Sequence, residues 1–270
     1  MDSTIGKSLW FDFDMARMHE LPITVRARFL TQKVAALAAL ARGSTFDLTL
    51  GEAIVTVTSI SDLGTLQSCI SDVRDELNSP DVLGCEPKIL DVGANIGQWT
   101  VATKLFWPRA TVLALEPNPA IFDLLVHNIS GLRDVECLQC AVGSSPGTSV
   151  LYRQPLTVMS TLFPDAKDTR DDPVEVPIRT IDEVLDGRAI DLLKIDVEGG
   201  ELDALRGAES TLRSTAFLLV EISLARGPVN GLVALVEVGR IAPKARLVKF
   251  GRPLGAPGQP ACEDVLIALD

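Results

Sequence analysis

From residue 88 onward, short apolar runs alternate with segments in which apolar residues recur at helical spacing. The apolar runs predict strands at 88–93, 111–116, 135–141, 190–196 and 216–222. The segments between them predict helices at about 98–106, 119–129, 180–186 and 201–213. A last helix follows, with closing strands near 246–250 and 264–269. This alternation predicts an α/β fold: a mostly parallel, seven-stranded, Rossmann-like sheet with helices on both faces.

The first 87 residues have a different pattern, which predicts an N-terminal extension ahead of a domain at 88–270. A helix is expected at 23–41 and one or two strands at 46–58. Apolar residues at three- and four-residue steps predict a second, amphipathic helix: Leu63, Leu66, Ile70, Val73 and Leu77. The first helix is apolar on most sides in its second half. The extension is therefore expected to cover the acceptor side of the protein or to form a homodimer contact.

The stretch from Lys88 to Thr100 joins a predicted strand to a predicted helix through a glycine-rich turn, Asp91-x-Gly93-x-Asn95-x-Gly97. Glycines let a backbone approach a ligand closely, and a helix start offers unpaired N–H donors. The turn therefore predicts a cofactor site. The residues expected to contact the cofactor here are Asp91, Gly93, Ala94, Asn95, Gly97 and Thr100.

Two classes of cofactor use such a turn. A dinucleotide fingerprint requires Gly-x-Gly-x-x-Gly, so that a pyrophosphate sits on the helix start. Here the third glycine of that fingerprint is missing, and Asp91 would repel a pyrophosphate while suiting a cationic amino-acid ligand. The pattern favours S-adenosylmethionine. An NAD(P)-dependent oxidoreductase and a non-catalytic protein that keeps the fold remain as alternatives.

The second predicted strand ends in Leu115-Glu116-Pro117-Asn118-Pro119. Glu116 follows Gly93 at a distance typical of an acid that accepts hydrogen bonds from both ribose hydroxyls. The alternative is a helix-capping acid, because a proline can begin a helix. We expect Glu116, Pro117 and Asn118 to bind the cofactor, with Ala141 and Val142 beside the adenine.

The stretch 190–201 carries charged residues inside a predicted central strand. Lys194, Asp196 and Glu198 alternate with Leu193, Ile195 and Val197, so each set shares one face. Buried charges are costly unless they are paired or functional. We expect Asp196 to lie beside the sulfonium as the candidate base, or to orient the acceptor, and Lys194 to be an ion-pair partner.

Four motifs together resemble the FkbM family of methyltransferases: Leu-Asp-Val-Gly-Ala-Asn-Ile-Gly, Leu-Glu-Pro-Asn-Pro, Val-Pro-Ile-Arg-Thr-Ile-Asp and Leu-Leu-Lys-Ile-Asp-Val-Glu-Gly-Gly-Glu. The resemblance covers roughly residues 60–223. It implies a class I methyltransferase fold and O-methylation of natural products, including sugar and glycolipid hydroxyls. It also implies that Asp196 lies by the methyl group and that these residues hold the cofactor: Asp91, Gly93, Asn95, Gly97, Glu116 and Asn118.

The acceptor is expected to approach over the later strands, near Ser160, Glu198 and Glu221. Residues 153–173 form a long segment typical of a lid. This segment and the start of the chain carry apolar and aromatic residues: Trp10, Phe11, Phe13, Leu156, Met159, Leu162 and Phe163. Such residues suit a neutral sugar on a lipid or polyketide carrier. The alternative is that they pack the extension onto the sheet. Asp196, Glu198 and Glu221 are also hard-oxygen ligands of the kind that binds Mg²⁺. No dense acidic run accompanies them, so we assign no metal ligands and keep Mg²⁺ as an alternative.

The amino-acid composition excludes some classes of binding partner. The 270 residues carry a net charge of −11, which argues against a nucleic acid, because phosphate binding requires clustered Lys and Arg. The longest apolar run, 34–41, is far too short for a transmembrane segment, and the N-terminus lacks a signal-peptide pattern. We therefore expect a cytoplasmic chain that does not bind nucleic acid, and the FkbM resemblance implies a small-molecule or glycolipid acceptor.

The sequence Cys137-Leu-Gln-Cys140 has the C-x-x-C spacing of some metal and redox sites. It falls within a predicted strand, where residues three apart point to opposite faces. We therefore interpret both cysteines as small buried hydrophobic residues.

Overall fold

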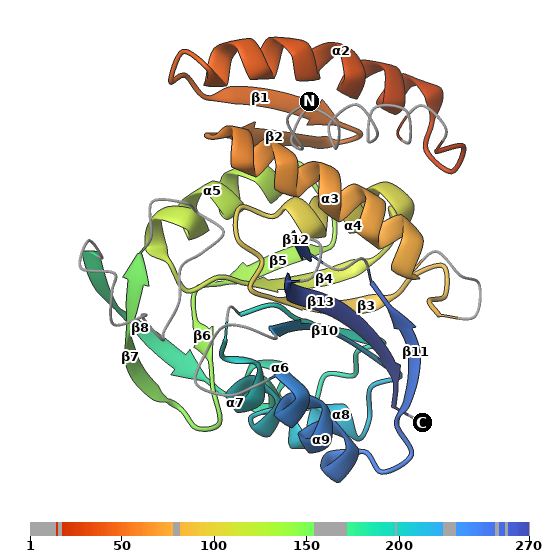
Figure 1. The fold of residues 1–270 in the computed structure, drawn as a ribbon, viewed down its shortest axis with the longest axis vertical. Helices are drawn as coiled ribbons and strands as arrows, with labels where there is room; N and C mark the ends of the chain where they lie inside the picture. The colour runs from red at the N-terminus through yellow and green to blue at the C-terminus, as the bar shows by residue number, and fades with distance from the viewer. Residues whose placement is uncertain are drawn as a thin grey trace.

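The computed structural model describes residues 15, 18–77, 82–153, 172–197, 199–223, 231–251, 254–256 and 259–269. Its central sheet has the strand order β11-β13-β10-β9-β3-β4-β5, and a short strand, β12, pairs with β13 off this path (Figure 1). The strands are β3 (Lys88–Val92), β4 (Thr111–Leu115), β5 (Val135–Leu138), β9 (Leu192–Ile195), β10 (Phe217–Ser223), β11 (Arg246–Phe250), β12 (Leu254–Ala256) and β13 (Gln259–Ala268). Neighbours from β5 to β10 are parallel, whereas β13 is antiparallel to both β10 and β11. The predicted fold is confirmed.

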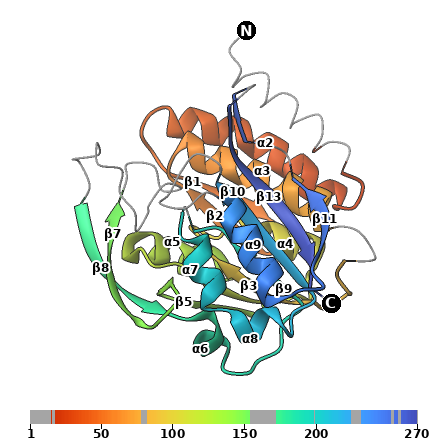
Figure 2. The same cartoon turned by 60° about the horizontal axis from the view of Figure 1, so that its bottom comes forward.

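Helices cover both faces of this sheet (Figures 1 and 2). One face carries α3 (Ile60–Leu77), α4 (Gln98–Phe106) and α5 (Pro119–Ile129). The other carries α6 (Ile181–Leu185), α7 (Glu201–Arg206), α8 (Glu209–Leu212) and α9 (Gly231–Ile241). Successive strand residues face opposite layers. Leu192 packs with the α3–α4 side and Leu193 with the α6–α9 side, as the alternation along the strand predicts.

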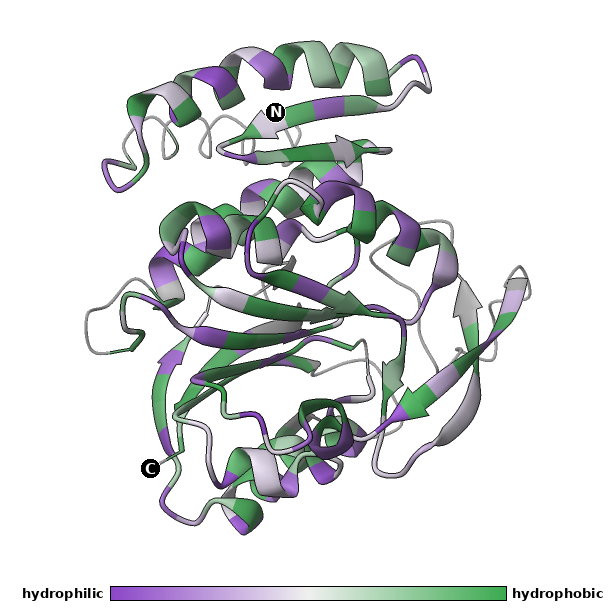
Figure 3. Ribbon diagram, turned by 180° about the vertical axis from the view of Figure 1, so that it is seen from behind, coloured by the Kyte–Doolittle hydropathy of each residue, from purple (hydrophilic) through white to green (hydrophobic). Residues whose placement is uncertain are grey.

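The N-terminal segment forms a further layer above α3, α4 and α5 (Figure 1). It comprises α2 (Ile23–Leu40) and the antiparallel hairpin of β1 (Phe46–Leu50) and β2 (Ala53–Val57). Apolar residues of this layer, of α3 and α4, and of the underlying sheet form one continuous buried cluster, and Figure 3 shows the sheet strands as largely hydrophobic. Within the described chain, no helix is both long enough and apolar enough to cross a membrane.

Asn128, at the end of α5, joins the N-terminal layer to the glycine turn. Its side chain accepts a hydrogen bond from Thr56 N at 2.8 Å, and its Nδ2 donates to Ile96 O at 2.8 Å. Because the amide is fully buried, both bonds are shielded from water and from competition. The extension is therefore tied directly to the loop that follows β3.

A second, three-stranded sheet departs from the predicted pattern. The predicted strand 135–141 ends at Leu138, and the chain then forms β6 (Ala141–Val142), which pairs with β8 (Asp172–Arg179) rather than with β4. Strand β7 (Gly147–Arg153) pairs antiparallel with β8, so the order is β6-β8-β7. Neither β7 nor β8 was among the predicted strands.

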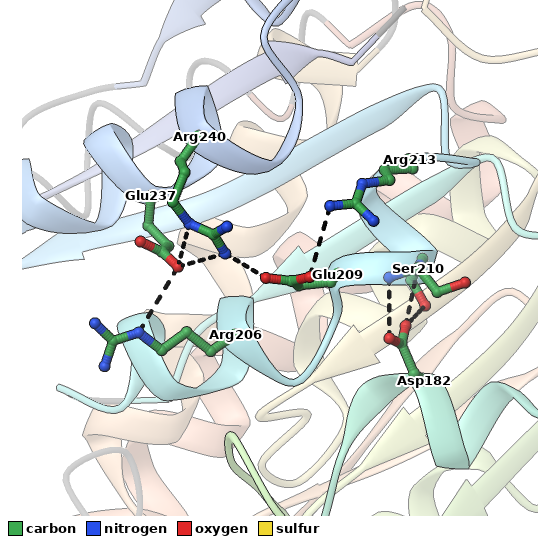
Figure 4. Close-up of polar contacts among 8 residues, drawn as sticks. Asp182, Arg206, Glu209, Ser210, Arg213, Glu237 and Arg240 are labelled. Carbon is green, nitrogen blue, oxygen red and sulfur yellow. Dashed lines mark hydrogen bonds and ion pairs between the residues drawn. The ribbon is translucent and has the colours of Figure 1, made fainter.

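The helix predicted at 201–213 is divided into α7 and α8 at Gly207. A β-carbon at Gly207 would lie 2.1 Å from Gly143 O, so the chain passes too close to the end of β6 for any side chain. Polar contacts fix the α8 start, where Asp182 accepts hydrogen bonds from Ser210 N at 2.9 Å and Thr211 N at 2.8 Å (Figure 4). On the same face, Arg240 bridges Glu209 and Glu237 and so connects α8 to α9.

Candidate functional site

A cavity of about 270 Å³ lies at the carboxyl ends of β3, β4, β9 and β10, where ligands bind in open α/β sheets. Its described lining combines strand ends, the glycine turn, helix α3 and the second sheet: Thr65, Ser68, Cys69, Asp72, Val92, Gly93, Ala94, Asn95, Gln98, Trp99, Glu116, Pro117, Cys140, Ala141, Val142, Leu151, Lys194, Asp196, Val197, Gly200, Leu219, Glu221 and Asp264. The volume is close to the lower limit for small-molecule pockets. The cavity therefore suits a small ligand.

The glycine turn is held against the end of β4. Gly93 N and Ala94 N both donate to Leu115 O, at 3.0 and 2.9 Å. Gly93 has φ +82° and Gly97 has φ +91°, a left-handed conformation that residues with side chains rarely adopt. The turn therefore presents backbone to the cavity.

Glu116 lies in the cavity wall with both carboxylate oxygens oriented by backbone donors. Asn95 N donates to Oε2 at 3.1 Å, and Asn118 N donates to Oε1 at 2.8 Å. Burial raises the pKa of the carboxyl to about 7, although these two hydrogen bonds act in the opposite direction. The alternative of a helix-capping role is wrong, because Asn118 caps α5 by accepting from Ala120 N at 3.2 Å.

Behind the turn, three charged groups form a line from the interior to the cavity. Lys194 Nζ lies 3.2 Å from Asp91 Oδ1 and 3.3 Å from Asp196 Oδ2. Asp91 is fully buried and also accepts a hydrogen bond from Thr100 Oγ1 at 2.7 Å. The ammonium group of Lys194 also lies 5.5 Å from the centre of the Trp99 ring. These contacts agree with the expected ion-pair role of Lys194.

Of these three charged groups, Lys194 is buried and protonated, and Asp196 is the one exposed to the cavity. Burial lowers the pKa of Lys194, but the carboxylates of Asp91 and Asp196 outweigh burial and raise the pKa above its ordinary value. Lys194 therefore stays protonated and cannot act as a base at neutral pH. The side chain of Asp196 is 39% exposed, so its carboxylate is accessible from the cavity that it lines.

The structure brings nine of the expected site residues together in the cavity wall: Gly93, Ala94, Asn95, Glu116, Pro117, Ala141, Val142, Asp196 and Glu221. Four others do not line it. Asp91 and Thr100 bond to each other behind the turn, Asn118 caps α5, and Gly97 packs toward Leu125 and Ile129. In the described structure these four therefore lie behind or beside the cavity wall, and their contact with the cofactor stays a prediction.

Other expected acceptor residues lie outside the described part of the chain. They are Ser160, Glu198, and the apolar and aromatic residues of segments 1–14 and 154–171.

Helix α3 contributes a wall of the cavity that the sequence analysis did not assign. Thr65, Ser68, Cys69 and Asp72 line the cavity, and their spacing of three, four and seven residues places them on one helical face. This small, polar face adjoins the apolar stripe that predicted the helix. The polar residues repeat at helical spacing too, and this repeat was a signal in the sequence that α3 has a second, polar face. Helix α3, which the sequence analysis assigned to the N-terminal extension, therefore forms part of the cavity wall.

Cys137 and Cys140 lie among apolar groups. Cys140 belongs to the buried cluster on the α6–α9 side, whereas Cys137 packs beside Ala94, Ala114 and Leu125. Burial raises the pKa of Cys69 well above its ordinary value, and the nearby Asp72 carboxylate adds a smaller increase. The Cys69 thiol is therefore protonated at neutral pH and is a poor nucleophile. Among the residues described, no group of three or more His, Cys, Asp or Glu is placed to hold a metal ion.

Comparison with known proteins gives the family. Residues 91–240 match the methyltransferase FkbM domain. The methyltransferase sdnD of Sordaria araneosa is 36% identical over 161 residues, which cover 47% of this chain and 62% of that protein. The hexuronic acid methyltransferase AglP of Haloferax volcanii is 30% identical over 184 residues, covering 66% of this chain and 71% of that protein.

A third relative, the 31-O-demethyl-FK506 methyltransferase FkbM of Streptomyces tacrolimicus, is 31% identical over 157 residues. These cover 45% of this chain and 59% of that protein, so the chain spans less than two thirds of the sdnD and FkbM sequences. The domain match includes the glycine turn, Glu116 and Asp196. With the sheet described above, it shows that this chain belongs to the FkbM methyltransferase family.

Proposed function

We propose that this protein transfers a methyl group from S-adenosylmethionine to a hydroxyl oxygen of a small natural product, and that the hydroxyl belongs to a sugar. The observation that carries the proposal is the placement of Glu116. Its carboxylate lines the cavity, and two backbone N–H groups fix both oxygens in position. An acid held in this way at the end of β4 accepts hydrogen bonds from the two ribose hydroxyls of a nucleoside.

The other lining residues fit the same cofactor. The backbone of Gly93, Ala94 and Asn95 would lie beside the amino-acid chain, and the small residues Ala141 and Val142 would flank the adenine. Carboxylates predominate among the charged lining residues, which favours a cationic sulfonium over a pyrophosphate. When bound, S-adenosylmethionine supplies an electrophilic methyl group.

The acceptor hydroxyl loses a proton as its oxygen is methylated, and we assign that proton to Asp196. Its carboxylate lies at the end of β9 and is accessible from the cavity. Lys194 fixes the carboxylate through its 3.3 Å contact and cannot itself accept a proton. A positioned general base contributes about 10²–10⁴-fold, and alignment of the reacting groups contributes ~7–11 kcal/mol in favourable systems.

A neutral sugar suits the acceptor side of the cavity. Glu221 of β10 and Asp264 of β13 are register partners, and both line the cavity, so they present carboxylate oxygens to sugar hydroxyls. The AglP relative is named as a hexuronic acid methyltransferase and the FkbM relative as a 31-O-demethyl-FK506 methyltransferase, which supports a small-molecule acceptor. The same carboxylates would repel a uronic acid. We therefore propose a neutral sugar carried by a lipid or a secondary metabolite.

Calorimetry with S-adenosylhomocysteine, NAD and NADP tests the cofactor. We expect S-adenosylhomocysteine to bind, and we expect Glu116→Ala to weaken its affinity at least about tenfold, because charge-assisted hydrogen bonds contribute ~1.5–3 kcal/mol each. Binding of NAD without S-adenosylhomocysteine would refute the proposal.

The acceptor is tested by comparing the rates of methyl transfer to matched neutral and uronic-acid glycosides. Preference for the uronic acid would refute the neutral-sugar assignment alone.

A further inference from the structure

A buried carboxylate, that of Glu201, follows the candidate base closely in the chain. Glu201 is the first residue of α7 and is only 7% exposed. It is not among the described residues that line the cavity, whereas Val197 and Gly200 of the same stretch are. Burying a carboxylate is costly unless its oxygens accept hydrogen bonds. The donors to this carboxylate therefore indicate its function.

The donors belong to the backbone of the turn that follows β9. Gly199 N donates to Glu201 Oε1 at 2.8 Å. Burial raises the pKa of Glu201, and hydrogen bonds from the backbone N–H groups of Gly199, of Glu201 itself and of Val197 act in the opposite direction. The N–H of Val197 belongs to the peptide bond that joins this residue to Asp196. Glu201 therefore holds the peptide next to the candidate base.

The turn is fixed from both sides. Asp196 N donates to Val92 O at 3.0 Å, which attaches the start of the turn to the end of β3. The far part of the turn contains two glycines, Gly199 with φ +103° and Gly200 at the N-cap of α7. Glycines have the greatest conformational freedom, so hydrogen bonds have to fix such a segment. Glu201 supplies them from the side opposite to β3.

We propose that Glu201 is a positioning residue for methyl transfer: its carboxylate holds the turn after β9 so that the Asp196 side chain is oriented to take the proton of the acceptor hydroxyl. The inference rests on the proposed function, because it assumes that Asp196 is the base. Glu201 acts through Asp196 and not on the substrate. A misplacement of about 1 Å can slow a reaction roughly 10²-fold, so its loss should affect the rate more than binding.

Single-turnover methyl transfer to a neutral glycoside tests this role in wild type, Glu201→Leu, Asp196→Asn and the double variant. We expect Glu201→Leu to slow transfer about 10- to 100-fold, because the base is no longer held in place. The affinity for S-adenosylhomocysteine, measured by calorimetry, should stay within a few-fold. In the Asp196→Asn background the same substitution should slow transfer by less than about threefold, because the base that it positions is already absent.

Two further variants separate positioning from general stability. Glu201→Gln keeps the shape of the side chain and one acceptor oxygen, so it should recover most of the rate lost in Glu201→Leu. Glu183 is the matched control, since it also accepts a hydrogen bond at a helix start, from Thr180 N at 3.2 Å, but is not among the described lining residues. Glu183→Leu should therefore leave the transfer rate and the affinity unchanged.

Hydrogen exchange of the backbone amides gives a second measurement that needs no acceptor. The amides of Val197 and Gly199 should exchange about tenfold faster or more in Glu201→Leu, because each loses its acceptor. The amide of Gly93, which donates to Leu115 O, should keep its wild-type rate.

Unchanged exchange at Gly199 in Glu201→Leu would overturn the inference. Equal slowing of transfer by Glu201→Leu in the wild-type and Asp196→Asn backgrounds would overturn it too, because Glu201 would then not act through Asp196. A wild-type protein that binds S-adenosylhomocysteine but methylates no glycoside would instead overturn the acceptor of the proposed function. The exchange rates would still decide whether Glu201 holds the turn.

Discussion

The carbonyl oxygen of Asp196 occupies the space beside Gly93, and a β-carbon on Gly93 would lie 1.7 Å from it. Asp196 N also donates to Val92 O at 3.0 Å, so the chain after β9 runs directly against the chain after β3. The glycine turn and the candidate base thus come from distant parts of the sequence but meet through backbone. Gly93 is required for this approach of two strand ends as well as for any approach of a ligand.

Gly93→Ala should therefore destabilise the protein strongly. The change adds an atom where the Asp196 backbone lies and forces a side chain into φ +82°. We expect a loss of several kcal/mol in the free energy of unfolding, measured by urea denaturation, because overpacking and backbone strain both contribute.

The control is Gly239→Ala in α9, where an added β-carbon would meet no described atom within 4 Å. Alanine is the better helix former, so this variant should gain about 0.5–1 kcal/mol. Similar stabilities for the two variants would show that the close approach at Gly93 is not rigid.

Lys194→Met should destabilise the protein by about 3–5 kcal/mol, because it leaves the fully buried Asp91 carboxylate without its cation. The double variant Asp91→Asn/Lys194→Met removes both charges and should recover much of the loss. Urea denaturation of wild type, both single variants and the double variant gives the coupling energy. Additive effects of the two substitutions would argue against an energetically important pair.

The central sheet was predictable because its strands are apolar runs of ordinary length, separated by helices with clear periodicity. Strands β7 and β8 were harder to recognise because β8 contains Pro173 and Pro177, and proline lacks the N–H that a strand ladder needs. The structure accommodates both prolines because β6 pairs only with Ile178 and Arg179. Among the strands that the structure describes, each proline therefore has a neighbour on one side, namely β7.

The site residues that follow strand ends were predictable, because the carboxyl ends of parallel strands meet at one edge of the sheet. This was sufficient to bring Gly93, Glu116 and Asp196 to one cavity. Spacing alone does not say whether a side chain points into the cavity or behind it, so Asp91 was assigned to the ligand although it lies behind the turn. The polar face of α3 was visible as a second periodicity, but its place in the cavity wall depends on how α3 packs against α4, which no local pattern records.

Binding of S-adenosylhomocysteine should depend on pH through Glu116, whose pKa is raised to about 7 by burial. Ribose hydroxyls donate to the ionised carboxylate, so below that pKa binding has to release a proton. The affinity should therefore rise as the pH increases toward about 7, by up to roughly tenfold per pH unit, and level off above it. Calorimetry at several pH values measures the slope. Glu116→Gln cannot ionise and should bind weakly with no such slope, and a flat wild-type profile would count against the assignment.

Asp196→Asn should lose most of the turnover while keeping the affinity for S-adenosylhomocysteine within a few-fold. The amide retains the size of the side chain but is a much weaker base, and a general base contributes about 10²–10⁴-fold. The substitution leaves the contact between the Asp196 backbone and Gly93 in place, so the fold and the cofactor half of the cavity should persist. Single-turnover methyl transfer to a neutral glycoside measures the effect, with calorimetry as the control for binding.

Two results would change the role of Asp196. Turnover equal to that of the wild type would remove it from the mechanism. Activity that is lost to a chelator and restored by Mg²⁺ would instead make Asp196 a candidate metal ligand, since carboxylates are the ligands that this ion prefers. The variant also separates the two functions of Lys194. Asp196→Asn should cost little stability, because Lys194 keeps its pair with the buried Asp91, whereas Lys194→Met should cost far more, because it leaves the Asp91 carboxylate buried without its cation.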